Sequence, residues 1–191
     1  GMGAHSLRSI LRLLRPKQWT KNIVVLAALV FALGDPAQGV TWAAARLALL
    51  ATALFCLVSS GVYILNDVRD VELDRIHPTK RLRPIAAGEI TRGAALALAL
   101  LLLAGAGYAA WRLDPAFSLV VAGYVVLQLL YTFGLKRVAL VDIFIIAGGF
   151  VLRALAGGVV IHVAVSPWLL LCTLLLALFL ALCKRRHELV I

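Results

Sequence analysis

The sequence is poor in the residue types that build metal centres and nucleophilic catalysts. It has three cysteines and four histidines among 191 residues, and they show neither zinc-site spacing nor an HExxH-type pattern. No arrangement of Ser, His and Asp, or of Cys and His, points to an activated nucleophile. A histidine-bound metal and a covalent mechanism are therefore disfavoured. We interpret the cysteines as packing residues in or beside apolar segments: Cys56, Cys172 and Cys183.

The chain also lacks the alternation of apolar and polar residues that marks strands, and it has no evident soluble domain, long linker or internal repeat. Apolar sequence dominates instead: 63% of the residues are hydrophobic and the mean hydropathy is +1.00, which exceeds what one soluble core of this size can bury. We predict an all-α integral membrane protein, because long uncharged runs without alternation favour helices over a barrel. About six spans are predicted, the first with a short apolar run: 20–34, 43–65, 94–111, 117–133, 138–161 and 167–183.

Acidic residues are scarce: nine Asp and Glu stand against 19 Lys and Arg, giving a formal net charge of +10. The placement of the basic residues argues against a nucleic-acid partner, because they gather in alternate connections between the predicted spans. They precede the first span, separate the second from the third and the fourth from the fifth, and follow the sixth. This pattern is typical of the positive-inside rule. It predicts that both ends are cytoplasmic, and no cleavable signal peptide is expected at the N-terminus.

One stretch, "LNDVRDVELDRIHPTKRLRP", concentrates charge of both signs directly after the second predicted span. If the helix continues past the bilayer, Asn66 or Asp67, Asp70 and Asp74 share one face. Mg²⁺ takes such oxygen ligands, usually through one or two carboxylates plus substrate phosphates, and the basic run at 80–83 could neutralise a diphosphate. The alternative is a solvated loop whose acids pair with nearby arginines. We favour a metal–diphosphate site, because the acids begin inside the apolar boundary, where charge is costly.

Two further charges, Asp142 and Arg153, lie inside the fifth predicted span. Eleven residues separate them, about three helical turns, so they share a face. Intramembrane charges usually face the bundle interior or a wet cavity. Asp142 could touch a substrate near the cytoplasmic side, whereas Arg153 could snorkel outward. A functional role and a structural ion pair are both open for these two residues.

The acidic stretch resembles a known family motif. "NDVRDVELD" looks like the NDxxDxxxD motif of the UbiA-type polyprenyltransferase superfamily, and "KRLRPIAAGEI" is similar to its K-x-RP-x-x-x-G continuation. "LLRPKQWTKN" and "KRRHEL" resemble the branch that transfers phosphoribose to decaprenyl phosphate. The resemblance implies a multi-helix bundle around a central cavity. Since members usually have about nine spans, residues 1–191 would form a single transmembrane prenyltransferase-like domain, the N-terminal two-thirds of a typical member.

The resemblance also implies roles for individual residues. Four would hold Mg²⁺ on the substrate diphosphate: Asn66, Asp67, Asp70 and Asp74. Four would be catalytic: Asp67, Asp70, Tyr131 and Lys136. The others would bind substrate phosphates or close the same polar chamber: Lys17, Lys21, Asn22, Lys80, Arg83, Asp142, Lys184, Arg185 and Glu188. Apart from the resemblance, Lys136 and Lys184 could also be positive-inside anchors, and Tyr131 could equally be an interfacial belt residue.

The activity implied is a Mg²⁺-dependent transfer of 5-phosphoribose from phosphoribosyl diphosphate to a polyprenyl phosphate such as decaprenyl phosphate. Diphosphate would be released, as in the synthesis of cell-wall arabinan precursors. A prenyltransferase that moves a prenyl chain from prenyl diphosphate to an aromatic or haem acceptor shares the metal site and is the first alternative. A cation-coupled transporter is the second, although transporters place their sites at the midplane. We expect a multi-pass protein in contact with the lipids of the inner (plasma) membrane, with its active site facing the cytoplasm, that could form a homo-oligomer.

Overall fold

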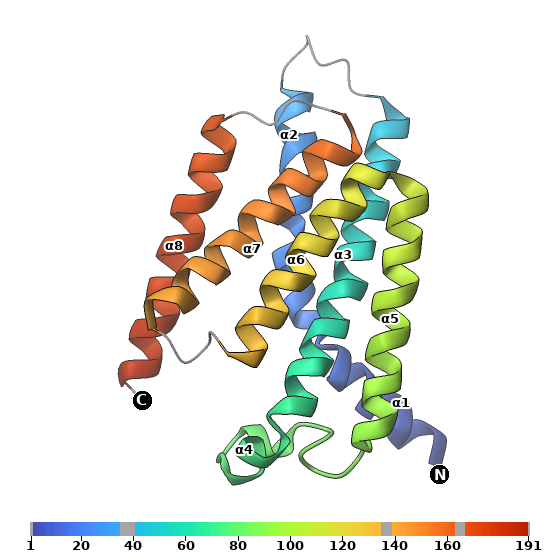
Figure 1. The fold of residues 1–191 in the computed structure, drawn as a ribbon, viewed down its shortest axis with the longest axis vertical. Helices are drawn as coiled ribbons and strands as arrows, with labels where there is room; N and C mark the ends of the chain where they lie inside the picture. The colour runs from blue at the N-terminus through green and yellow to red at the C-terminus, as the bar shows by residue number, and fades with distance from the viewer. Residues whose placement is uncertain (1, 35–40, 135–138, 163–166, 191) are drawn as a thin grey trace.

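The computed structural model describes residues 2–34, 41–134, 139–162 and 167–190. Within these ranges the regular structure is helical and no strand occurs (Figure 1). This confirms the predicted all-α fold for the part of the chain that is described. The elements are α1 (Met2–Leu14), the 3₁₀ helix η1 (Pro16–Leu26), α2 (Ala27–Leu33), α3 (Trp42–Arg69), α4 (Val71–Ile76), η3 (Lys80–Leu82), α5 (Arg92–Leu113), α6 (Pro115–Phe133), α7 (Ala139–Val160) and α8 (Pro167–Val190).

Five of the described helices are long and apolar enough to cross a membrane: α3, α5, α6, α7 and α8. They correspond to the second to sixth predicted spans. The first predicted span, 20–34, is not a single helix, because η1 and α2 divide it. The 11 residues of η1 cover about 22 Å at the 3₁₀ rise of about 2.0 Å per residue. The seven residues of α2 add about 10 Å, so the two together match a hydrocarbon core of about 30 Å.

Polar caps and a proline set where α5 and α6 begin. Thr91 precedes α5, and its side chain accepts a hydrogen bond from the backbone N–H of Ala94 at 3.1 Å. Asp114 does the same for α6, accepting from the N–H of Ala116 at 2.8 Å. Pro115 follows at the first helical position, where its missing N–H has no partner to lose. The single-residue connection at Asp114 places α5 and α6 antiparallel.

The bundle packs around α3, which contacts η1, α5, α6 and α7. Phe55 on α3 packs against Phe117 and Tyr124 on α6, with ring centroids 6.1 and 5.3 Å apart. Small residues let other backbones approach closely, as is common in membrane bundles. A Cβ added to Gly157 of α7 would lie only 1.8 Å from the carbonyl oxygen of Val25 in η1. The 3₁₀ segment is therefore held directly against α7.

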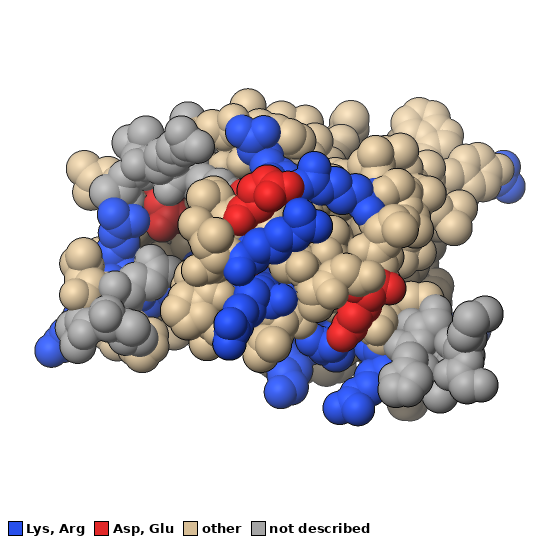
Figure 2. Space-filling view, turned by 90° about the horizontal axis from the view of Figure 1, so that it is seen from below, with Lys and Arg blue, Asp and Glu red and all other residues tan. Residues whose placement is uncertain are grey.

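One end of the bundle carries α4, the connection 77–91 and both ends of the described chain (Figure 1). We call it the charged end, because Lys and Arg surround Asp and Glu there (Figure 2). Helix α1 lies against it: Ser9 Oγ donates to Glu89 Oε2 at 2.8 Å, and Arg12 pairs with the same carboxylate at 3.1 Å. The Ser9 hydrogen bond, followed by the charge of Arg12, lowers the pKa of Glu89. Helix α1 is thus tied to the connection between α4 and α5.

Candidate active site

A cavity of about 650 Å³ lies at the charged end. Its wall comes from segments that are far apart in the sequence: residues around the start of η1, the end of α3, α4 and the segment after it, and the ends of α6 and α8. Both acidic and basic side chains line it. We call it the main cavity.

The acidic wall is built where α3 passes into α4. The backbone N–H of Asp70 donates to the carbonyl oxygen of Asn66 at 3.0 Å, and that of Asp74 donates to the carbonyl oxygen of Asp70 at 2.8 Å. The i, i+4 path therefore continues across the short break between the two helices, and all three side chains fall on one side. Asn66, Asp70 and Asp74 all line the main cavity, which is the convergence that their spacing predicts.

The oxygens on this wall fit a magnesium ion. Asn66 Oδ1 is buried and accepts no hydrogen bond from any residue that the structure describes. Such an atom costs about 1–3 kcal/mol, a cost that a cation would remove. Two carboxylates and an amide oxygen suit Mg²⁺, which takes its other ligands from water and phosphates. Within the described ranges no group of three or more His, Cys, Asp or Glu is arranged for a metal, so a phosphorylated substrate would have to complete the site.

Asp67 departs from its predicted role as a ligand. Its side chain is 2% exposed, forms an ion pair with Arg15, and lies 3.4 Å from a guanidinium nitrogen of Arg83. It is absent from the lining of the main cavity. One further residue along an α-helix turns a side chain by about 100°, which rotates Asp67 away from the face that Asn66 shares with Asp70. Asp67 is instead the buried counter-charge of two arginines.

Cations from several segments face the acidic wall. Arg83 contacts the acidic wall directly, since its Nη1 lies 3.1 Å from Asp74 Oδ2. Of the predicted cations, the structure brings four to the main cavity: Lys21, Lys80, Arg83 and Lys184. Lys17 is not among them and lines a neighbouring pocket. Lys136 lies outside the described residues, as does the side chain of Glu188.

The 3₁₀ geometry of η1 explains why Lys17 and Lys21 diverge. With three residues per turn, residues four apart point about 120° away from each other, whereas residues three apart are aligned. Arg15, Gln18 and Lys21 follow that period and all line the main cavity. Sequence reasoning missed Arg15 and Gln18, because both precede the predicted span 20–34 and no helical period was assigned to them.

Helix α6 contributes a polar strip near its end. Tyr131 lines the main cavity as predicted, together with Gln128 and Thr132, which were missed. The three are spaced i, i+3 and i+4, so they share one face of the helix. That spacing was the available signal for Gln128 and Thr132.

Asn22 is not a wall residue of the main cavity. It is 0% exposed, inside the bundle, and its Oδ1 accepts a hydrogen bond from Arg153 Nε at 2.8 Å. Arg153 Nη2 donates to the hydroxyl of Tyr124 at 2.8 Å, and its guanidinium lies 4.8 Å from the centre of that ring. Since Arg153 is only 4% exposed, it does not snorkel outward. These three side chains link η1, α6 and α7.

Asp142 pairs with Arg185 rather than with Arg153. Its Oδ2 lies 3.6 Å from the Arg185 guanidinium, which connects the first turn of α7 to the last turns of α8. Neither residue lines the main cavity, so the predicted substrate contact is not supported for them. Their common role in this structure is to join two helices beside the cavity.

Comparison with known proteins identifies the family to which the chain is similar. Residues 22–185 match the UbiA prenyltransferase family. The chain belongs to that family. The matched range contains the acidic wall and nearly all of the residues that form the long helices.

Individual relatives with a named activity give a more specific comparison than the family match does. The chain is 43% identical to a decaprenyl-phosphate phosphoribosyltransferase of Mycolicibacterium smegmatis over 94% of its length, and 42% identical to one of Corynebacterium glutamicum over 95%. It spans 57% and 55% of those two proteins. A UbiA homolog from Archaeoglobus fulgidus, solved with GPP and Mg²⁺, superposes with a TM-score of 0.72 at 24% identity, covering 89% of this chain and 60% of that one. This last comparison supports the fold.

Proposed function

We propose that this chain forms the diphosphate-binding part of a membrane phosphoribosyltransferase. The reaction is transfer of 5-phosphoribose from phosphoribosyl diphosphate to a polyprenyl phosphate, of which decaprenyl phosphate is the expected example. The observation that carries the proposal is the main cavity, where an acidic face that fits Mg²⁺ opposes cations from three separate segments. The two relatives named above favour phosphoribose as the transferred group.

Asn66, Asp70 and Asp74 are the residues that would hold the metal, with Asp67 fixing Arg15 and Arg83 beside them. When bound, Mg²⁺ would supply electrostatic stabilisation to the departing diphosphate. Lys21, Lys80 and Lys184 would bind the outer diphosphate oxygens, because ammonium groups stabilise the negative charge that grows as the bond breaks.

The reaction balances without a protein nucleophile. The bond between C1 of the ribose and the diphosphate oxygen breaks, and its electron pair leaves with diphosphate. A phosphate oxygen of the polyprenyl phosphate forms the new bond to C1. That oxygen is already ionised, so no proton has to be removed. The side chains of the cavity therefore act by orienting two anions and neutralising their charge.

The alternatives explain less. A prenyltransferase acting on an aromatic or haem acceptor would use the same acidic wall, so the relatives' names and the motifs "LLRPKQWTKN" and "KRRHEL" separate it from the proposed reaction. A transporter would place its site near the midplane, whereas the main cavity lies at the charged end. By the positive-inside rule, this end would face the cytoplasm from the inner (plasma) membrane. Because the chain spans little more than half of its named relatives, the complete activity is tested on the full-length protein.

The test uses that full-length protein, purified in detergent, with Mg²⁺, phosphoribosyl diphosphate and decaprenyl phosphate. We expect a lipid-linked phosphoribose and one diphosphate per product, both abolished by chelation of Mg²⁺. A parallel reaction offers geranylgeranyl diphosphate and 4-hydroxybenzoate. Product only in the parallel reaction would replace the proposal with the prenyltransferase alternative.

A further inference from the structure

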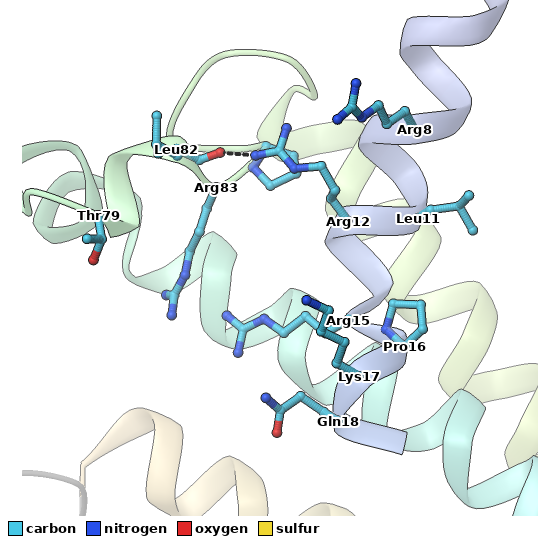
Figure 3. A pocket seen from close by; sticks show the side chains of 11 residues that line it. Arg8, Leu11, Arg12, Arg15, Pro16, Lys17, Gln18, Thr79, Leu82 and Arg83 are labelled. Atoms are coloured by element: carbon cyan, nitrogen blue, oxygen red, sulfur yellow. Dashed lines mark hydrogen bonds between the residues drawn. The ribbon is translucent and has the colours of Figure 1, made fainter. Parts of the chain in front are cut away.

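A second pocket, of about 600 Å³, lies beside the main cavity between α1, the start of η1 and residues 79–84 (Figure 3). We call it the basic pocket. None of the described residues that line it is acidic, and five are cationic: Arg8, Arg12, Arg15, Lys17 and Arg83. Apolar side chains, among them Leu11 and Leu82, complete the lining.

The positive charge of the basic pocket is only partly compensated. Arg12 pairs with Glu89 and donates to the carbonyl oxygen of Leu82. Arg8 and Lys17 form no ion pair with any described residue, although the charge of Arg8 helps to lower the pKa of Glu89. Both are exposed. Two cations at the edge of this pocket are therefore available to an anion.

The basic pocket and the main cavity share a wall. Arg15, Gln18 and Arg83 line both of them, and Figure 3 shows the Arg15 and Arg83 side chains directed toward each other. Asp67 holds both guanidinium groups through one terminal nitrogen each. A guanidinium carries five N–H donors in a fixed plane, so each arginine can meet a phosphate as well as its carboxylate. The shared wall thus presents positive charge to two anions at once.

Helix α1 places the basic pocket at the level where lipid head groups lie. Arg8 and Arg12 alternate along it with Leu7 and Leu11, whose side chains are 61% and 49% exposed. A helix with exposed leucines and a basic face lies in the membrane interface. A ligand that enters beside this helix would combine a negative group with an apolar chain.

We propose that the basic pocket binds the phosphate group of the polyprenyl phosphate acceptor, while the main cavity holds the donor diphosphate. This inference rests on the proposed function. The two phosphates need different surroundings: the donor diphosphate is bound with a metal beside carboxylates, whereas the same carboxylates would repel an acceptor phosphate that carries no metal. The basic pocket offers cations without acids, and the shared wall keeps the acceptor oxygen next to the donor. Lys17 is accordingly an acceptor-binding residue.

The test is the Arg8→Gln/Lys17→Gln double variant of the full-length protein in uncharged maltoside micelles. Neither residue lines the main cavity. Loss of two charge-assisted contacts should raise the KM for polyprenyl phosphate roughly tenfold or more. The KM for phosphoribosyl diphosphate and kcat should change less than about twofold. The matched control is Arg81→Gln/Arg186→Gln, which removes the same charge from exposed residues of the charged end that line neither pocket. Equal KM values in the two double variants, or a rise confined to the donor, would overturn the proposal.

Equilibrium binding of farnesyl phosphate tests the basic pocket independently of the transfer reaction. The Arg8→Gln/Lys17→Gln variant should bind it several-fold more weakly than the control variant, and inorganic phosphate should compete poorly. Vesicles of phosphatidylglycerol form the third arm: weaker vesicle binding with unchanged farnesyl phosphate affinity would mean a site for bulk anionic lipid and would overturn the proposal. Absence of transferase product from the unaltered protein would contradict the proposed function alone, since the binding comparison still decides whether the pocket takes a lipid phosphate.

Discussion

At the scale of single residues, position on a helix face decides which of the clustered acids faces the main cavity. Asn66, Asp70 and Asp74 line the main cavity, whereas Asp67, one position along, is buried against two arginines. Asp70 lies in the middle of these three cavity-lining residues, directly after the last residue of α3. It is therefore the most direct test of the acidic wall.

We expect Asp70→Asn in the full-length protein to insert and fold normally while losing most transferase activity. The substitution keeps the size of the side chain but removes a charge from the metal's surroundings. The loss should be at least the roughly 10–100-fold seen when outer-shell partners of metals are removed, and raised Mg²⁺ should restore part of it. Activity is measured as lipid-linked phosphoribose formed against Mg²⁺ concentration.

The matched control for Asp70 is Glu72→Gln. Glu72 is a nearby acid whose side chain is 72% exposed, pairs with Arg75 and Arg92, and does not line the main cavity. Its replacement should leave activity within about twofold, because exposed ion pairs contribute little. Near-normal turnover of Asp70→Asn at limiting Mg²⁺ would remove Asp70 from the ligand set.

The buried hydrogen bonds of Arg153 lead to a prediction about the melting temperature. Its replacement by Met removes the donors to Asn22 Oδ1 and to the Tyr124 hydroxyl, and each buried polar group left without its partner costs roughly 1–3 kcal/mol. We expect a lower melting temperature in detergent for Arg153→Met. Arg186→Met, at an exposed position near the end of α8, should melt like the unaltered protein. Identical melting of the two variants would show that the Arg153 network does not stabilise the bundle.

At the scale of elements, η1 is the unusual piece. An 11-residue 3₁₀ helix is long for that geometry, and two features go with it here. It lengthens a short apolar segment, and its three-residue period aligns Gln18 with Lys21 at the main cavity, next to Arg15 at its N-cap. Its close contact with α7 at Gly157 holds it in place.

Gly157→Ala tests that contact. The new Cβ would collide with the Val25 carbonyl oxygen, only 1.8 Å away, so η1 and α7 must separate, at a cost of about 1–3 kcal/mol. We expect a lower melting temperature and, since Lys21 moves with η1, a higher KM for phosphoribosyl diphosphate. The control is Gly123→Ala on α6, where a Cβ meets nothing within 4 Å. If Gly157→Ala and Gly123→Ala behave alike, the close approach of η1 to α7 is not required.

At the scale of the whole molecule, the helices bring all the charged residues that line the main cavity to the charged end of the bundle. The positive-inside rule predicts that this end faces the cytoplasm. The prediction is tested in a background with Cys56, Cys172 and Cys183 replaced by Ala. A cysteine at Arg112, at the far end of α5, should react with an impermeant maleimide on intact spheroplasts. A cysteine at Arg81 should react only after permeabilisation, and the reverse pattern would invert the proposed topology.

Much of this architecture could be predicted from local sequence. Five of the six predicted spans appear as long apolar helices. The acidic face follows from spacing along a continuous helical path, and the polyprenyltransferase resemblance, with the role it implies for Tyr131, follows from short motifs. Hydropathy and the 3.6-residue period are local properties of the chain, which is why both could be recognised from the sequence. The 3₁₀ geometry of the first predicted span was missed, since nothing local in 20–34 signals a 3₁₀ path held by contact with α7.

Only the tertiary structure decided which side chains from distant segments become partners. Asp67 meets Arg15, Asn22 meets Arg153, and Asp142 meets Arg185, across 52, 131 and, by subtraction of the residue numbers, 43 positions. The sequence by itself determined that these polar groups lie in or beside the membrane, where each must find a partner. Which partner it finds depends on how the helices pack, because a buried charge is stabilised by whichever donor or acceptor the fold brings within hydrogen-bonding distance.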